Sequence, residues 1–267
     1  MVFRILWHLF KLFAIIEKNN LKEALMLKTI LFDLDGTLLP MELDQFLHAY
    51  FHSLGAYLKD LIYPKSLFQY LDVATEAMVN NSGDLTNEQV FKNIFFSFIK
   101  EDPTLYMDRF DRFYTEEFPK IQSAVGFSSI MQKSVLMLKQ KGYELVVATN
   151  PLFPRSAIEH RIQWAGFTPK DFIHITSYEQ CHFSKPQKNY FKEILKDIQR
   201  KPEDCLMVGN DVQEDLAAGE LGIKTFLIMD HMIHRSDEKI PADFTGTYED
   251  FYTFVNKLPI VNKERKW

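Results

Sequence analysis

The residues best suited to chemistry begin with two aspartates, Asp33 and Asp35, that directly follow a short apolar run. Residues i and i+2 of an extended segment point to the same side, so both carboxyl groups can face one pocket if the extended backbone continues that far. Their roles would then differ, because an ionised carboxylate can attack as a nucleophile while a protonated one can give its proton to a leaving group. Gly36 lets the backbone turn away without a side chain in the pocket, and Thr37 completes the segment.

Further polar side chains follow three later apolar runs: Thr149 and Asn150 after the second, Lys185 after the third, and Asp211 and Asp215 after the fourth. In open α/β sheets, ligands bind outside the carboxyl ends of the strands. If the runs are strands of one parallel sheet, all of these groups meet at one edge. The sequence therefore predicts a single polar site built from four strand ends.

Phosphoryl transfer is the chemistry that this set of groups suits. Such a site needs a hard cation with oxygen ligands and fixed donors for the remaining phosphate oxygens. Asp33 and Asp211 can supply carboxylate oxygens to Mg²⁺, which typically takes only one or two carboxylates beside water and substrate. The Thr149 hydroxyl and the Lys185 ammonium group suit the phosphate oxygens.

Each of these groups also has an ordinary structural interpretation. Asp and Gly after a strand are common turn residues. Asp211 and Glu214 could form a capping box on the next helix, with Asp215 adding favourable charge in its first turn. A single residue such as Lys185 is usually a solvated surface lysine. The conjunction at four strand ends favours the functional interpretation over these alternatives.

The elements that must position these groups follow from the apolar pattern. Five short runs read as buried parallel strands: Thr29 to Phe32, Glu144 to Ala148, Phe172 to Thr176, Cys205 to Val208, and Lys224 to Ile228. Three crossover helices are predicted between them: Ile130 to Gln140, Arg155 to Ala165, and Asn189 to Gln199. The alternation predicts an α/β fold with a Rossmann-like, doubly wound parallel sheet.

The interval between Leu38 and Gly126 breaks this rhythm, because it has helical patterns but no convincing strand. It is too long for a connection, so we expect a helical domain inserted after the first strand. The expected divisions are residues 27–40 and 121–267 for the α/β core and residues 41–120 for the insertion. Phe91, Phe95 and Phe98 recur at helical spacing and are expected to form the core of this small bundle.

Composition restricts the environment and the partners. Hydrophobic residues make up 46% of the chain and charged residues 25%, as in soluble globular proteins. A net charge of -5 argues against nucleic-acid binding, which needs a basic face. The two cysteines, Cys181 and Cys205, form no disulfide or zinc-binding pattern and fit a reducing compartment, so we expect a cytoplasmic protein.

Residues 1–26 form an apolar extension that is helical by pattern. Arg4, His8 and Lys11 interrupt its run at helical spacing, which is unsuited to a membrane span of about 20 apolar residues. Three interpretations stay open: a helix packed on the body, an interfacial anchor, or residues upstream of a native start at Met26. Membrane contact through this segment is not the outcome that we favour.

The chain resembles the phosphatases of the haloacid dehalogenase (HAD) superfamily that carry a helical cap. Its first motif is similar to Asp33-Leu34-Asp35-Gly36-Thr37, its second to Thr149, its third to Lys185, and its fourth to Asp211 with Asp215. The resemblance extends from Leu27 to about Phe254. It also implies that the inserted helices are the cap.

This resemblance implies a role for each residue. Asp33 would form a phospho-aspartyl intermediate, and Asp35 would serve as general acid and then as base. Mg²⁺ would be bound by Asp33, Asp211 and the backbone carbonyl of Asp35, while Asp215 would orient Lys185 or the water around the metal. The backbone amide of Asn150 would help to hold phosphate.

The expected function is Mg²⁺-dependent hydrolysis of phosphate monoesters of a small metabolite. Two alternatives stay open: a phosphomutase of the same superfamily, and a non-catalytic protein that binds a phosphorylated ligand for regulation. Substrate identity and oligomeric state are not specified by these motifs.

Overall fold

A six-stranded parallel sheet forms the centre of the molecule, described here by a computed structural model for residues 27–261. The strands are β1 Thr29–Phe32, β2 Glu144–Val147, β3 His174–Ile175, β4 Cys205–Gly209, β5 Lys224–Ile228 and β6 Phe244–Gly246. Their order is β3-β2-β1-β4-β5-β6, with every neighbouring pair parallel. This is the order of a doubly wound sheet, so the predicted fold class is confirmed.

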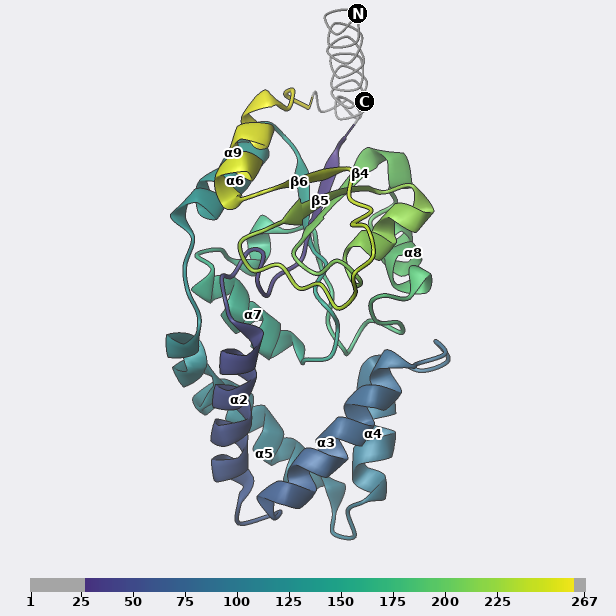
Figure 1. Ribbon diagram of the computed structural model, residues 1–267. Helices are drawn as coiled ribbons and strands as arrows, with labels where there is room; N and C mark the ends of the chain where they lie inside the picture. The colour runs from purple at the N-terminus through teal and green to yellow at the C-terminus, as the bar shows by residue number, and fades with distance from the viewer. Residues whose placement is uncertain (1–26, 262–267) are drawn as a thin grey trace, which may run out of the picture.

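Helices cover both faces of the sheet because successive side chains of each strand point to opposite sides. Ile30 and Phe32 of β1 join the larger core with α6 (Ser129–Gln140), α7 (Arg155–Trp164) and α9 (Tyr248–Lys257). Leu31 packs on the other side with α8 (Lys188–Asp197) and the 3-10 helix η4 (Leu216–Leu221). Figure 1 shows α6 and α9 on one side of the sheet and α8 on the other.

Four α-helices lie between β1 and α6, at the end of the molecule that is lowest in Figure 1. They are α2 Leu43–Leu58, α3 Pro64–Val79, α4 Asn87–Ser97 and α5 Pro103–Glu116, followed by the 3-10 helix η1 Phe118–Ala124. The two ends of this insertion come together where the Gly126 amide donates a hydrogen bond to the Pro40 carbonyl at 2.7 Å. Shorter 3-10 helices stand at η2 Pro169–Asp171 and η3 Pro202–Asp204.

The aromatic residues of α4 differ from the expected pattern at one position. Phe95 is fully buried and Phe91 is partly buried against the core, as the helical spacing predicts. Phe98 is 41% exposed, so its assignment to the core is wrong. The helix ends at Ser97, and Phe98 is the capping residue beyond it, where its ring stacks on Tyr70 with 4.6 Å between centroids.

The predicted strands all occur, but one strand and one α-helix were not predicted. β3 is only two residues long instead of five, and β6 and α9 follow the last predicted strand. β6 is the three-residue sequence Phe-Thr-Gly at the sheet edge, too short to give an apolar run. No helix of residues 27–261 has the length and apolarity needed to cross a membrane. The predictions for residues 1–26 lie outside the described residues.

Candidate active site

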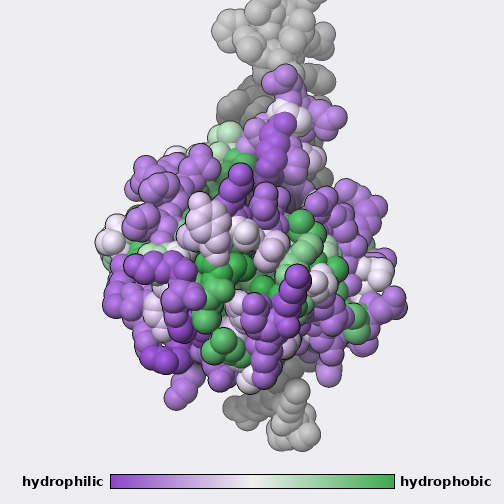
Figure 2. All heavy atoms as spheres, turned by 90° about the horizontal axis from the view of Figure 1, so that it is seen from below, coloured by the Kyte–Doolittle hydropathy of each residue, from purple (hydrophilic) through white to green (hydrophobic). Residues whose placement is uncertain are grey.

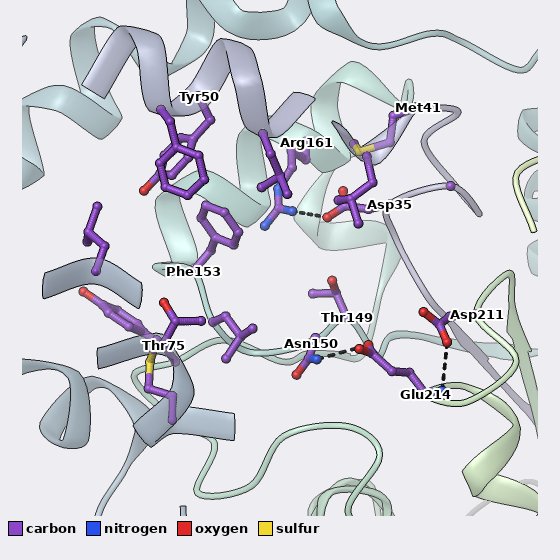
Figure 3. Close-up of a pocket in the computed structure, with 18 of the residues that line it drawn as sticks. Asp35, Met41, Tyr50, Thr75, Thr149, Asn150, Phe153, Arg161, Asp211 and Glu214 are labelled. Atoms are coloured by element: carbon purple, nitrogen blue, oxygen red, sulfur yellow. Dashed lines mark hydrogen bonds and ion pairs between the residues drawn. The ribbon is translucent and has the colours of Figure 1, made fainter. Parts of the chain in front are cut away.

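The carboxyl ends of β1, β2 and β4 bring the sequence-predicted residues to one cavity. β1 pairs with β2 on one side and with β4 on the other, and the Asp33 amide extends the ladder by donating to the Val208 carbonyl at 2.9 Å. The predicted residues that line this cavity are Asp33, Asp35, Gly36, Thr149, Asn150, Asp211 and Asp215. Lys185 and Thr37 lie just behind the lining and bond to it or to its neighbours. Figure 3 shows the cavity, with Asp35, Thr149, Asn150 and Asp211 among the labelled residues.

Lys185 is the centre of a buried ion-pair triad. Its ammonium group lies 2.8 Å from Asp33 Oδ1 and 2.6 Å from Asp215 Oδ1, and only 1% of its side chain is exposed. Burial by itself lowers the pKa of Lys185, but the charges of Asp215 and Asp33 outweigh burial and raise that pKa well above its ordinary value. Lys185 is therefore a fixed cation beside the Asp33 carboxyl group.

Asp33 has a pKa raised well above its ordinary value. Burial is the main cause, the nearby charge of Lys185 opposes it, and the carboxylates of Asp215 and Asp35 add to it. A bound cation would act in the opposite direction, because positive charge favours the ionised carboxylate. Positive charge near Asp33 therefore favours its ionised form, against the effect of burial.

Asp35 forms an ion pair with Arg161, a residue of α7 that no sequence motif indicated. Arg161 is 1% exposed, and its guanidinium lies over the Phe153 ring at 4.6 Å from the centroid. Burial raises the pKa of Asp35, and the charge of Arg161 opposes that rise. The second oxygen of Asp35, Oδ1, is buried and has no hydrogen-bond partner among the described residues, so it is available to a bound substrate.

β1 ends at Phe32, so Asp33 and Asp35 do not lie in one extended segment and the predicted i, i+2 geometry does not occur. The backbone turns after Asp33, and Asp35 forms an isolated bridge with Leu39. Gly36 has φ of 78°, and a Cβ there would overlap the Asn210 side chain. Both carboxyl groups nevertheless line the same cavity, because the turn rather than the strand directs Asp35 into it.

Thr37 supports this turn from the buried side. Its hydroxyl donates to Asn210 Oδ1 at 3.0 Å, and the Asn210 amide donates to the His231 carbonyl at 2.6 Å. The Tyr248 hydroxyl donates to the Gly36 carbonyl at 3.2 Å. The loops after β1, β4 and β5 are therefore joined by hydrogen bonds beneath the site.

Asp211 follows β4 and takes part in a turn as well as in an ion pair. Its Oδ1 accepts the amides of Gln213 and Glu214, each at 3.0 Å, as the capping alternative expects. The reciprocal half of a capping box is missing, because Glu214 accepts instead from the Asn150 side chain at 3.1 Å. Asp211 Oδ2 also lies 2.6 Å from Arg235 Nη2, and the sequence did not indicate this partner.

Thr149 and Asn150 stand at the end of β2. Thr149 is 3% exposed, and its carbonyl accepts from the hydroxyls of Thr176 and Tyr190 at 2.7 and 2.8 Å. The side-chain oxygen of Asn150 accepts a hydrogen bond from the backbone amide of Lys185 at 3.3 Å. Asn150 therefore links the end of β2 both to the Lys185 loop and to Glu214 after β4.

The donor set fits a hard divalent cation by charge and by chemistry. Five carboxyl groups face three cationic side chains here: Asp33, Asp35, Asp211, Glu214 and Asp215 against Arg161, Lys185 and Arg235. Two negative charges are in excess when all are ionised, and burial with like charge raises the pKa of Glu214. Among residues 27–261, no three His, Cys, Asp or Glu side chains form a metal-ligand cluster. Mg²⁺ typically takes only one or two carboxylates from the protein, so it does not need a cluster of three such side chains.

The fold and the site together define a class: an α/β enzyme with a carboxylate pair and a buried lysine at the carboxyl ends of a parallel sheet. The family model of haloacid dehalogenase-like hydrolases matches residues 27–222. The chain belongs to this family. The predicted recognition as a HAD superfamily phosphatase is therefore confirmed, and the protein is an enzyme of that kind.

Two curated relatives match most of the chain. The phosphoglycolate phosphatase of Aquifex aeolicus (strain VF5) is 27% identical over 225 residues, which cover 82% of this chain and 92% of the relative. The pyrophosphatase PpaX of Anoxybacillus flavithermus (strain DSM 21510 / WK1) is 25% identical over 202 residues, covering 74% of this chain and 82% of the relative. Both relatives are phosphatases by name.

Solved structures show the same fold at lower identity. A HAD phosphatase from Thermococcus onnurineus superposes with a TM-score of 0.56 at 17% identity, covering 88% of this chain and all of that one. The HAD-hydrolase YfnB from Bacillus subtilis, bound to magnesium, gives a TM-score of 0.52 at 20% identity over 86% of this chain and 99% of its own.

Proposed function

We propose that the protein hydrolyses phosphate monoesters with Mg²⁺ through a phosphoryl group carried on Asp33. The observation that carries this proposal is the buried triad in which Lys185 joins Asp33 to Asp215, with Asp35 two residues further along the chain. A lysine in this position neutralises an equatorial phosphate oxygen while it holds the attacking carboxylate. No neighbouring hydroxyl, thiol or histidine is needed as the nucleophile.

The reaction has two displacements at phosphorus. A carboxylate oxygen of Asp33 attacks, the bond from phosphorus to the ester oxygen breaks, and that oxygen leaves with the bonding electrons and takes a proton from Asp35. A water molecule then attacks the phosphoryl group, gives a proton to Asp35, and the bond to Asp33 breaks. Free phosphate and the Asp33 carboxylate result, so Asp35 regains its proton in each cycle.

The other site residues hold phosphate and metal. The Thr149 hydroxyl, the Asn150 amide and Lys185 would bind the phosphate oxygens. Asp33, Asp211 and the carbonyl of Asp35 would bind Mg²⁺, which supplies positive charge against the phosphoryl oxygens when bound. Arg235 pairs with Asp211, so this arginine and Mg²⁺ would share that carboxylate.

The four inserted helices are proposed as a cap. In this proposal the core comprises residues 27–40 and 121–267, and the cap comprises residues 41–120. Residues of all four helices line the cavity that contains Asp33 and Asp35. A cap in this place would exclude bulk water from the phospho-aspartyl intermediate. A phosphomutase would instead pass the phosphoryl group to a second substrate hydroxyl, and no observation favours that outcome.

Replacement of Asp33 tests the nucleophile. Asp33→Asn keeps the shape of the side chain but removes its charge, so we expect phosphate release from small esters with Mg²⁺ to fall by a factor of at least about 10⁴. The measurement is phosphate release at saturating Mg²⁺. Acid-quenched wild-type enzyme should also carry one phosphoryl group on the peptide that contains Asp33, detected by mass spectrometry.

Asp84→Asn is the matched control, because Asp84 is exposed in the loop between α3 and α4 and, among residues 27–261, its side chain accepts a hydrogen bond only from the Ser82 hydroxyl, at 3.3 Å. It should retain full activity. Hydrolysis by Asp33→Asn at the wild-type rate would refute the assignment. Isomerisation of a phosphorylated substrate without phosphate release would identify a mutase instead.

A further inference from the structure

The cavity that begins at Asp33 and Asp35 is much larger than a phosphate group needs. Its volume is about 1410 Å³, and it extends from the strand ends to the inner sides of α2, α3, α4 and α5. Ligand cavities typically measure about 300–1,000 Å³. The part beyond the carboxylates is therefore the space into which the leaving group of an ester would extend.

The wall of this outer part is largely apolar and aromatic. Six of its side chains are Leu47 and Phe51 of α2, Phe68 of α3, Phe91 and Phe96 of α4, and Met107 of α5. Four of them, Leu47, Phe51, Phe91 and Phe96, pack on the core with one side and are only partly buried. Apolar side chains that are open to a cavity stabilise the hydrocarbon part of a ligand, because the contact removes apolar surface from water.

The aromatic rings form a continuous wall rather than isolated contacts. The rings of Phe51 and Phe68 are 5.4 Å apart in an edge-to-face arrangement, and Phe68 remains 36% exposed. Tyr50 and Phe153 continue the wall towards Arg161 and Asp35, as Figure 3 shows. The outer face of the four helices, seen from below, has hydrophobic side chains among hydrophilic ones (Figure 2).

Charge on the wall does not favour a second anionic group on the substrate. Within the described part of the chain, the lysine and arginine side chains that line the cavity are Lys92, Arg161 and Arg235. Each is paired with a carboxylate: Lys92 with Glu88 at 2.7 Å, Arg161 with Asp35, and Arg235 with Asp211. The wall also carries the carboxyl groups of Asp44, Asp72 and Asp111. A second phosphate or carboxylate would thus meet repulsion.

We infer that the alcohol released by this enzyme is predominantly hydrocarbon, aliphatic or aromatic, and carries no second anionic group. This inference rests on the proposed phosphomonoester hydrolysis and specifies its substrate class. The ester R–O–PO₃²⁻ would place its phosphate at Asp33 and its hydrocarbon group R against the aromatic wall. One relative is named a phosphoglycolate phosphatase. Phosphoglycolate differs from the inferred substrate, because its R group carries a carboxylate instead of being hydrocarbon.

A series of linear alkyl phosphates from ethyl to decyl tests the inference with the full-length enzyme and Mg²⁺. The alcohols have nearly equal acidity, so kcat/KM reports burial of the chain and not leaving-group reactivity. Burial of a methylene predicts a rise of about two- to four-fold in kcat/KM for each CH₂ until the cavity is filled. Phosphoglycolate should be hydrolysed less efficiently than any ester longer than ethyl phosphate.

Phe68→Ser places a polar group in the wall while removing only a partly exposed ring. The ratio of kcat/KM for decyl phosphate to that for ethyl phosphate should fall about ten-fold. Phe127→Ser is the matched control, because Phe127 is 54% exposed and lies outside the cavity lining. Its ratio should equal that of the wild type.

The possible outcomes distinguish failure of the inferred substrate class from failure of the proposed phosphatase function. Hydrolysis that depends on Asp33 but does not rise with chain length, or that is fastest for phosphoglycolate, overturns the apolar substrate class and leaves the phosphatase proposal intact. Equal ratios for the Phe68 and Phe127 variants also overturn it. Absence of turnover for every ester, with or without a second anionic group, refutes both proposals.

Discussion

Arg161 places a full positive charge against Asp35, the residue that we propose as the acid and base. The Arg161 side chain is 1% exposed, and that of Asp35 is 23% exposed to the cavity. Loss of one partner from a buried ion pair leaves the other charge uncompensated. Because Asp35 still reaches solvent, we expect Arg161→Met to lower the free energy of unfolding by about 2 kcal/mol, less than for a fully buried pair. Urea denaturation measures this change.

Arg155→Met is the control on the same helix. Arg155 pairs with Glu159 at 2.7 Å, but both side chains are about one-third exposed. Its loss should cost about 1 kcal/mol or less. In the background of Asp35→Asn, the cost of Arg161→Met should shrink, since the charge that it compensates is gone. Equal costs with and without Asp35→Asn would contradict a specific pair.

At the residue scale, the sequence could predict the groups that follow strands but not their partners. Asp33 and Asp35 stand in a recognisable segment, and Lys185 is found because it follows an apolar run. Arg161 gives only a weak signal, a charged residue on the apolar stripe that contains Ile158 and Ile162. Arg235 pairs with Asp211 across a loop whose path no periodicity describes.

At the scale of elements, Asn87 ties the start of α4 to the loops of the active site. Asn87 is fully buried; its side-chain amide donates to the Pro151 carbonyl at 3.1 Å and to the Ser184 hydroxyl at 3.2 Å, and its oxygen accepts from Asn81 at 2.8 Å. Pro151 follows Asn150, and Ser184 precedes Lys185. The helix that lines the cavity is thus bonded to the two loops that would hold phosphate.

Removal of this link should loosen α4 and weaken the fold. Asn87→Ala leaves a buried carbonyl without its donor, so we expect a loss of about 1–3 kcal/mol in the free energy of unfolding. Backbone amides of α4 should exchange faster with solvent, which hydrogen exchange with mass spectrometry can measure. Asn80→Ala, at an exposed bond to the Glu76 carbonyl, should change stability by about 0.5 kcal/mol or less. Unchanged exchange in α4 would contradict this role.

The elements that the sequence predicts well are those whose pattern is local. β1 and β4 are continuous apolar runs with no exposed residue, and they occur with nearly the predicted bounds. β6 is defined by its pairing with the edge of β5, where Phe244 lies beside Phe226. The aromatic residues of α4 follow the helical period until the helix ends, and the period cannot say where it ends. Strand pairing and helix capping thus set the element bounds that periodicity does not determine.

At the scale of the whole molecule, the site concentrates carboxyl groups that repel one another in a buried place. Burial raises the pKa of Asp33, Asp35 and Glu214, each against the partial compensation of a nearby cation. The fold therefore carries an electrostatic cost at the carboxyl ends of its central strands. A divalent cation bound there would offset this cost only in the folded state, since the proposed ligands Asp33 and Asp211 follow β1 and β4 and are far apart in the sequence.

Mg²⁺ should consequently stabilise the whole fold. Binding to the native state alone adds about 2.7 kcal/mol at a concentration of 100 times Kd, which for a chain of this size raises Tm by roughly 5–10 °C. The measurement is thermal unfolding of the full chain in excess chelator and in Mg²⁺. Asp211→Asn should lose most of the Mg²⁺-dependent rise, whereas the exposed control Asp84→Asn should keep it. A rise of equal size in both variants would show that Mg²⁺ binds elsewhere, and no rise in the wild type would contradict a metal site between β1 and β4.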